Sequence, residues 1–161
     1  MTIKPALSKL FAALVYRRIS KWKKNAVPAQ MCVLKKLIVA AQNTSFGKDH
    51  GFSGIKTYGD FKKHVPVRDY EELRTYIERV VEGEEDVLWP GKPAYFAKTS
   101  GTTSGVKYIP ISKESMPEHI KAARNALLCY IHETGNTDFV DGKMIFLQGS
   151  PEMHVKAGIS T

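Results

Sequence analysis

The sequence predicts an α/β protein, in which a helical segment over residues 1–92 precedes the start of a mixed sheet over residues 93–161. Two observations predict this class. Apolar residues recur at intervals of three or four through most of the first part, as they do on the buried faces of helices. Alternating and continuous apolar runs, which are typical of strands, appear only in the second part. The length of 161 residues and the hydrophobic content of 43% suit one globular domain.

The first two helices are predicted from this spacing. One should run from Ala6 to Lys24, because Pro5 can occupy its first turn. Its expected inward face consists of Leu7, Leu10, Phe11, Leu14, Val15 and Ile19. The other should run from Pro28 to about Gln42. Its expected inward face consists of Met31, Leu34, Leu37, Ile38 and Ala41.

Residues 43–54 are rich in Gly, Asn, Ser and Asp and are predicted to form a loop. Three further helices are predicted from residues that can cap their first turns. These are Thr57 for a helix to His64, Asp69 with Glu72 for a helix to Val81, and Ser115 with Glu118 for a helix to Glu133. The expected inward face of the last helix consists of Met116, Ile120, Ala123, Leu127 and Ile131.

Three strands are expected after residue 93. Alternation predicts the first over Ala94 to Thr99 and the second over Lys107 to Ile111, paired through the loop between them. The apolar run from Lys143 to Gln148 is typical of a strand buried in an α/β sheet. Residues 155–161 are expected to add no closing element. We therefore expect an incomplete domain, the amino-terminal piece of a longer protein.

The net charge of +8 is unevenly distributed. Residues 1–48 carry ten basic and no acidic side chains, whereas residues 49–161 carry fourteen basic and sixteen acidic ones. Such a basic segment can contact nucleic acid, an anionic membrane or an acidic partner, or it can simply form a solvated helix face. We favour the solvated face and expect no nucleic-acid partner, because no aromatic residues alternate with the basic ones as in a base-stacking surface.

The sequence also argues against a membrane span, a secretory signal and a metal site. No apolar run approaches the roughly 20 residues that cross a bilayer, and Arg17 and Arg18 interrupt the first apolar stretch, so we expect no membrane span or secretory signal. The five histidines have no metal-ligand spacing, so no side-chain metal site is expected. Cys32 and Cys129 lie in apolar helical patterns and are expected to be reduced, buried thiols of a cytoplasmic protein.

The residues most suited to chemistry lie in the loop between the two paired strands. The loop consists of Ser100, Gly101, Thr102, Thr103, Ser104 and Gly105, and Lys107 follows it. Glycines allow the backbone to approach a ligand, and hydroxyl and N–H groups can bind phosphate oxygens. Lys107 adds a mobile positive charge. Val106 separates Gly105 from Lys107, so this is not a Walker loop. The alternative is a flexible Ser/Gly hairpin without a ligand.

With its surroundings, the loop resembles the nucleotide-phosphate loop of acyl-adenylate-forming enzymes. Within them the chain resembles the Gretchen Hagen family of auxin-responsive acyl-acid amido synthetases, in its bacterial form, over roughly residues 30–150. The supporting segments are Phe61 to Val67, Tyr70 to Leu73, Tyr76 to Val80, Gly83 with Glu84, Leu88 to Gly91, and Tyr108 to Ser112. Lys107 lies one position closer to the loop than in many members, and the chain stops before the family's later nucleotide-binding motifs.

The resemblance implies the fold of an adenylating enzyme and a ligase reaction. ATP would activate a small carboxylic acid as its adenylate, and an amino acid would then accept the acyl group. The loop, residues 100–105, would bind the β- and γ-phosphates, while Mg²⁺ and Lys107, as the catalytic residue, spread the developing charge. Arg124, on the helix after the loop, could pair with the substrate carboxylate, or it could be a surface arginine whose stem covers apolar residues.

Two other functions stay open. One is an adenylate-forming thioester ligase that uses coenzyme A or a carrier protein. The other is a non-catalytic module whose basic helices bind a membrane or a partner. The loop does not distinguish the two ligases, but the segments upstream of it favour the amido synthetase.

Overall fold

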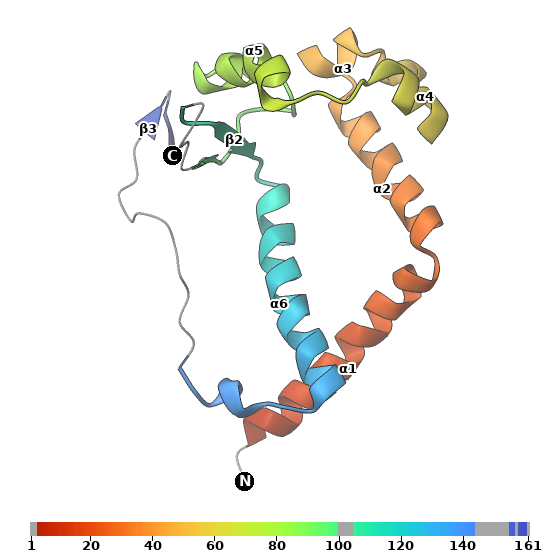
Figure 1. Cartoon of the computed structure of the whole chain (residues 1–161), viewed down its shortest axis with the longest axis vertical. Coiled ribbons are helices and arrows are strands. Elements are labelled where there is room, and N and C mark those ends of the chain that lie inside the picture. The colour runs from red at the N-terminus through yellow and green to blue at the C-terminus, as the bar shows by residue number, and fades with distance from the viewer. Residues whose placement is uncertain (1–2, 100–104, 144–154, 157, 161) are drawn as a thin grey trace. The chain divides into compact units, whose positions relative to one another are not determined.

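A computed structural model describes residues 3–99, 105–143, 155–156 and 158–160. The chain forms two compact units, each built from two separate stretches of sequence. One unit combines Met1–Ala29 with Met116–Pro151, and the other combines Gln30–Ser115 with Glu152–Thr161. Helices fill most of the first ninety residues and a small mixed sheet follows, so the predicted α/β class is confirmed (Figure 1).

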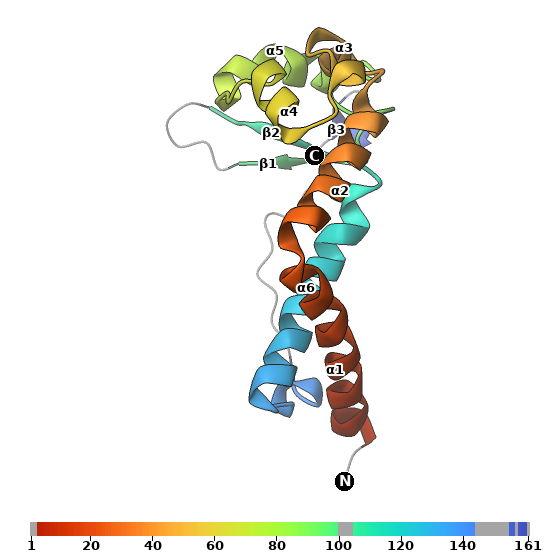
Figure 2. The same ribbon diagram turned by 90° about the vertical axis from the view of Figure 1, so that its right-hand side faces the viewer.

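The first unit is a pair of helices that pack side by side. Helix α1 covers Ile3–Lys24, α6 covers Ser115–Thr134, and the 3-10 helix η2 covers Asp138–Val140. Figure 2 shows α1 beside α6. The buried core of the unit consists of Ala12, Val15, Leu128 and Ile131, with Ile19, Phe139 and Val140 packed against it.

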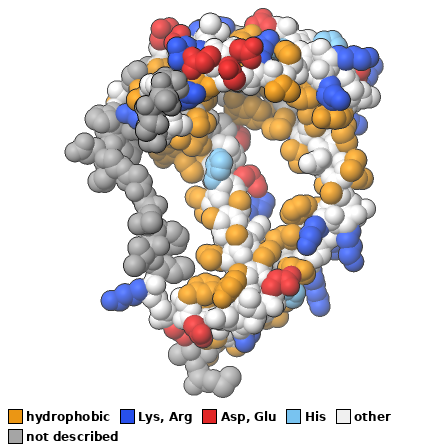
Figure 3. Space-filling model, in the orientation of Figure 1, with side chains coloured by type: hydrophobic (Ala, Val, Ile, Leu, Met, Phe, Trp, Pro, Cys, Tyr) orange, Lys and Arg blue, Asp and Glu red, His pale blue; other side chains and the backbone are white. Residues whose placement is uncertain are grey.

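The inward faces predicted for these two helices are largely wrong. Four of the six side chains expected to be buried on α1 are exposed, namely Leu7, Leu10, Phe11 and Leu14. On α6 the exposed ones are Ile120, Ala123 and Leu127. Ala12 and Leu128 are buried instead. Both helices carry apolar residues on more than one face, and the neighbouring element decides which face it covers. Figure 3 shows hydrophobic side chains at the surface of the helical parts of the chain.

Helix α2, Ala26–Ala41, confirms the second predicted helix, and Pro28 lies in its first turn. Its last part contributes Ile38 and Ala41 to a second core, while Leu37 remains exposed, contrary to expectation. The other members of this core are Phe52 and Ile55, with Leu34, Phe46, Phe61, Val65 and Trp89 packed against them.

The stretch predicted as a loop after α2 is partly helical. Helix α3 covers Ser45–Asp49 and the 3-10 helix η1 covers Phe52–Gly54. The buried Thr44 caps α3, since its hydroxyl accepts from the Gly47 N–H at 3.0 Å and donates to the Ala41 carbonyl at 2.7 Å. Five residues are too few to show a helical period, so only the cap could have predicted α3.

Helices α4, Tyr58–His64, and α5, Tyr70–Val81, begin at the predicted caps, and each cap is a complete capping box. The predicted box at the start of α6 is not formed. Ser115 is the first helical residue, and its N–H and hydroxyl both bind Ser112. The Glu118 carboxylate accepts from Lys121 instead of from the backbone at the helix start.

The sheet has the strand order β2-β1-β4-β3. Strands β1, Tyr95–Lys98, and β2, Tyr108–Ile111, pair antiparallel as predicted. Strand β4, Ile159–Ser160, runs parallel to β1 and antiparallel to β3, Val155–Lys156. The expectation that residues 155–161 add no element is therefore wrong, because two-residue strands leave no readable period. The predicted strand at residues 143–148 lies outside the described residues from residue 144 onward.

Helix α5 lies against the β1–β2 hairpin in both views (Figures 1 and 2). Their shared core consists of Val80, Val87, Phe96 and Ile159, with Tyr76, Val81, Leu88 and Tyr108 packed around it. This core fixes the orientation of α5 relative to the two strands that carry the predicted phosphate loop. The first residue of α5 consequently lies beside the start of β2.

Both cysteines are free thiols, but neither is buried. Cys32 is exposed and Cys129 is partly exposed, which corrects the predicted burial. Cys32 lies on a different face of α2 from the buried Ile38 and Ala41. Within the described part of the chain, every helix is too short or too polar to cross a membrane.

Candidate functional site

The predicted phosphate loop connects β1 to β2, and the structure shows how its base is closed. The register pairs Lys98 with Tyr108, and one residue further the Thr99 N–H donates to the Lys107 carbonyl at 3.1 Å. These contacts bring together Thr99 and Lys107, the residues that flank the predicted phosphate loop. Of the predicted phosphate-binding residues, Ser100, Gly101, Thr102, Thr103 and Ser104 lie outside the described residues. Their contacts with a nucleotide remain a prediction.

Gly105 marks the return of the loop toward β2. Its φ of 80° lies in the left-handed region that favours glycine. Apart from the two chain neighbours of Gly105, no atom of the described residues lies within 4 Å of the position that a Cβ would occupy there. The backbone at Gly105 is thus open on the side where another residue type would carry its side chain, which suits the close approach of a ligand.

Lys107 and Tyr70 contact one another at the end of this loop. The Lys107 ammonium nitrogen lies 5.1 Å from the centre of the Tyr70 ring. The Tyr70 hydroxyl accepts from the Tyr108 N–H at 2.9 Å and lies 3.5 Å from the Tyr108 carbonyl, to which it donates. One side chain of α5 thereby contacts two successive residues at the start of β2.

Sequence reasoning placed Tyr70 only within a resemblance segment and gave it no role. Tyr70 and Tyr108 lie 38 positions apart in the chain. Periodicity, caps and loop composition report on neighbours within a turn or two, so none of these signals pairs the two residues.

Arg124, the predicted substrate-binding residue, lies in the first unit, whereas Gly105 and Lys107 lie in the second. It is exposed on α6, with its guanidinium carbon 5.9 Å from the centre of the Phe11 ring. The guanidinium also donates to the Asn125 side-chain oxygen at 3.4 Å. These contacts cover part of an exposed aromatic ring, and the role of Arg124 toward a substrate stays a prediction.

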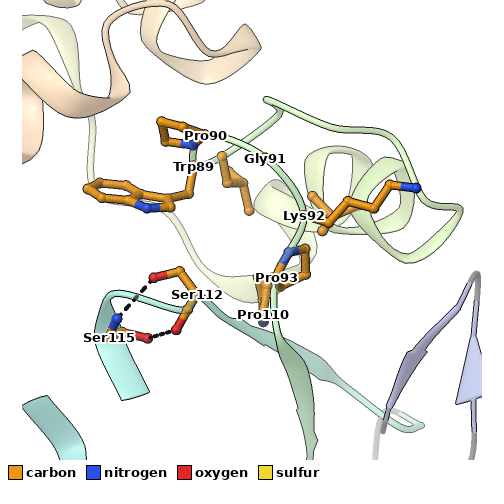
Figure 4. A pocket seen from close by; sticks show the side chains of 10 residues that line it. Trp89, Pro90, Gly91, Lys92, Pro93, Pro110, Ser112 and Ser115 are labelled. Carbon is orange, nitrogen blue, oxygen red and sulfur yellow. Dashed lines mark hydrogen bonds between the residues drawn. The ribbon is translucent and has the colours of Figure 1, made fainter. Parts of the chain in front are cut away.

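A pocket of about 220 Å³ lies at the other end of the hairpin, where β2 leads into α6 (Figure 4). Its walls are formed by Val80, Leu88, Trp89, Pro90, Gly91, Lys92, Pro93, Pro110, Ser112 and Ser115. The hydroxyls of Ser112 and Ser115 are engaged with each other's backbone. Gly105 and Lys107, the described residues at the end of the phosphate loop, do not line this pocket.

One carboxylate borders this pocket. The Trp89 indole N–H donates to Glu114 at 3.0 Å. The backbone N–H of Glu114 itself, the Ser112 hydroxyl and the Trp89 indole lower the pKa of the Glu114 carboxyl below its usual range. Glu114 is therefore ionised at neutral pH. Its carboxylate links the Trp89 segment to the residue just before α6, and we assign it a structural role.

The described side chains offer no metal centre. Among residues 3–99, 105–143 and the short strands near the carboxyl end, no three or more His, Cys, Asp or Glu side chains come together in a way that could hold a metal ion.

Comparison with known proteins points to one family. Residues 15–161 match the GH3 family N-terminal domain. The jasmonoyl–L-amino acid synthetase JAR4 of Nicotiana attenuata is 26% identical over 140 residues, which are 85% of this chain and 24% of that protein. The indole-3-acetic acid-amido synthetase GH3.15 of Arabidopsis thaliana is 39% identical over 79 residues, which are 47% of this chain and 13% of that protein.

A solved structure shows the same fold. The AtGH3.15 acyl acid amido synthetase, in complex with 2,4-DB, superposes with a TM-score of 0.81 at 22% identity, covering 92% of this chain and 26% of that one. The chain spans about a quarter of the length of this protein and of JAR4. The relatives named here are plant proteins and lend no support to the expected bacterial form.

Proposed function

The chain belongs to the GH3 family, and from this premise we propose that it supplies the amino-terminal part of an ATP-dependent acyl-acid amido synthetase. The names of its relatives support the substrate class, since one is a jasmonoyl–L-amino acid synthetase and the other an indole-3-acetic acid-amido synthetase. The observation that carries the proposal is the hairpin closed between Thr99 and Lys107, which presents a Ser/Thr/Gly loop in a chain of this family.

In the proposed first step, an ionised substrate carboxylate attacks the α-phosphorus of ATP and pyrophosphate leaves. No general base is needed, because a carboxylic acid is already ionised at neutral pH. The loop, residues 100–105, binds the β- and γ-phosphates through hydroxyl and N–H groups. Lys107 stabilises the charge that develops on the leaving pyrophosphate. In the second step the amino group of the amino acid attacks the acyl carbon and AMP leaves.

We propose that Mg²⁺ accompanies ATP. Mg²⁺ commonly binds through substrate phosphates and retained waters with few protein ligands, which agrees with the lack of a ligand cluster among the described side chains. We also propose a cytoplasmic location, which is supported by the two free thiols at Cys32 and Cys129.

The test is acid-dependent exchange of pyrophosphate into ATP by the full-length ligase that carries these residues. Replacing Ser100, Thr102 and Thr103 together by alanine removes three donors to phosphate oxygens. Each charge-assisted hydrogen bond contributes on the order of 1.5–3 kcal/mol, so the exchange rate should fall by at least about 100-fold. Ser53→Ala, which removes a hydroxyl outside the hairpin, is the matched control and should leave the rate unchanged.

Exchange that is undiminished in the triple variant would overturn the assignment of the loop. The acceptor is tested separately, by supplying the enzyme and its acid with either amino acids or coenzyme A. Amide formation is the expected result. A thioester as the sole product would replace the amido synthetase with the thioester ligase.

A further inference from the structure

We propose that Tyr70 is a positioning residue for Lys107 and for the strand that follows the phosphate loop. This inference rests on the proposed function, because it assigns Tyr70 a part in adenylation through Lys107. It is carried by two separate contacts of the same side chain. The ring lies beneath the Lys107 ammonium, and the hydroxyl binds the backbone of Tyr108.

The ring contact restricts the position of the Lys107 ammonium group. Lysine has a flexible four-carbon stem, and its charge adopts many positions when nothing holds it. An ammonium within about 6 Å of an aromatic ring centre is attracted to the negative face of the ring. At 5.1 Å, the Tyr70 ring holds the Lys107 charge beside the loop base that Thr99 closes.

The hydroxyl contact restricts the backbone next to Lys107. The Tyr108 N–H donates to the Tyr70 hydroxyl at 2.9 Å, and Tyr108 is the first residue of β2. The strand therefore begins at a point that α5 holds in place. Tyr70→Phe would keep the ring beneath Lys107 and remove the hydrogen bond to Tyr108, so substitution can separate the two contacts.

Tyr70 can position other groups because it is itself held. It is the first residue of α5 and lies within the capping box that Asp69 and Glu72 form. Further along the helix, Val80 is buried against Val87 and Phe96 of the hairpin core. Groups placed by rigid, packed elements hold a reactive geometry better than groups placed by loops.

The experiment measures acid-dependent adenylation kinetics of the full-length ligase with ATP as the varied substrate. Tyr70→Leu, which removes both contacts, should lower kcat about tenfold and leave the KM for ATP within twofold. The reason is that losing an interaction used mainly in the transition state lowers kcat. Tyr70→Phe, which keeps the ring, should lower kcat about threefold. Tyr76→Phe removes a hydroxyl of the same helix that binds Asp49 and should leave kcat unchanged.

The decisive comparison is made in the Lys107→Ala background. If Tyr70 acts through Lys107, adding Tyr70→Leu there should lower kcat by less than about twofold, because interacting groups do not contribute independently. A further tenfold loss would show a merely structural role and overturn the inference. Amide hydrogen exchange supplies a readout apart from activity, since Tyr108 should exchange faster in Tyr70→Phe than in Tyr76→Phe. Equal exchange in the two variants would equally overturn it.

The outcomes separate the inference from the function on which it rests. Absence of acid-dependent adenylation in the wild-type ligase would overturn the proposed function and this inference together. Full activity of Lys107→Ala would remove Lys107 from the reaction and the role of Tyr70 with it. Impaired Lys107→Ala beside unimpaired Tyr70→Leu would overturn the positioning role alone and leave the proposed function standing.

Discussion

At the scale of single residues, Lys107 differs from Lys113 in its surroundings rather than in its charge. It lies at the base of the loop, is partly buried, and rests on an aromatic ring. Lys113, by contrast, is exposed beyond the other end of the hairpin. The two lysines therefore form a matched pair for testing what the position near the loop contributes.

We predict that Lys107→Ala lowers kcat for adenylation more than it raises the KM for ATP. The charge matters most when pyrophosphate leaves, and an interaction made only in the transition state affects kcat. Loss of a charge-assisted contact on the order of 1.5–3 kcal/mol corresponds to a fall in kcat of about 10- to 150-fold. Steady-state kinetics of Lys107→Ala beside Lys113→Ala measure this. A change in KM alone would make Lys107 a uniform binding contact.

A second residue-scale prediction concerns Gly47 in helix α3. A Cβ at this position would overlap the Ala41 carbonyl oxygen and press on backbone carbons of Ala41 and Gln42. Backbone atoms cannot rotate away, so Gly47→Ala should lower the free energy of unfolding by about 2–3 kcal/mol. Gly54→Ala is the matched control, because no described atom beyond its chain neighbours lies within 4 Å of its Cβ position. Chemical denaturation of the two variants measures the difference, and equal stabilities would contradict the close contact.

At the scale of elements, the caps were the features that the sequence predicted best. Thr57, with Asp60 three residues later, and Asp69 with Glu72 both form the reciprocal hydrogen bonds of a capping box. A cap depends only on residues within one turn, so local sequence determines it. The box expected at Ser115 does not form, because the hydroxyl of Ser112, just outside the helix, accepts the Ser115 N–H.

The Asp60 cap makes stability depend on pH. Hydrogen bonds from the Thr57 side chain and from the backbone N–H groups of Thr57 and Lys56 hold the pKa of the Asp60 carboxyl below its usual value of 3.8. Because the pKa is lowered on folding, the contribution to stability is complete above the unfolded pKa and is lost as pH falls through the folded pKa. We predict that wild type exceeds Asp60→Asn in stability by a constant amount above about pH 4, and that this advantage shrinks below it.

Denaturation of the two proteins from pH 2.5 to pH 7 measures this advantage. Its persistence, undiminished, at the acid end would mean that the ionised carboxylate contributes nothing to the cap. Thr57→Ala in the Asp60→Asn background gives the control, because it removes the other half of the box without adding a titrating group.

Helix faces were predicted less well than helix ends. On α2 the apolar spacing correctly placed Ile38 and Ala41 inward, because this end of the helix is covered by η1 and its neighbours. On α1 the same kind of spacing selected side chains that the described part of the chain leaves exposed. Spacing identifies residues that share a face, but the covering element comes from a distant part of the sequence.

At the scale of the whole molecule, the loop of the candidate site could be predicted and its support could not. Glycines, hydroxyls and Lys107 lie within eight consecutive residues, 100–107, so composition and resemblance were enough to propose them as a phosphate site, and their contacts stay a prediction. Tyr70 reaches the site from α5, and the pairing of β4 with β1 joins residues at the far end of the chain. These long-range contacts follow from packing, which the local pattern does not contain.

A prediction at this scale concerns these 161 residues expressed alone. They span about a quarter of JAR4 and AtGH3.15, and transition-state stabilisation needs donors fixed on all sides of the reacting phosphorus. We predict no measurable pyrophosphate exchange and an affinity for ATP no tighter than the millimolar order, roughly −4 kcal/mol. Isothermal titration and the exchange assay measure the two quantities.

The same fragment should self-associate through the exposed apolar face of α1. Leu7, Leu10, Phe11 and Leu14 lie on that face with exposed fractions of 46–61%. Contiguous exposed apolar side chains of this kind favour association in water. Replacing Leu7 and Leu10 by glutamine should therefore shift the fragment toward monomer in light scattering, whereas Lys9→Gln, on the same helix, should not. A monomeric wild-type protein of 161 residues would contradict the predicted association through α1. Pyrophosphate exchange by the same protein would contradict the prediction that these residues hold only part of the site.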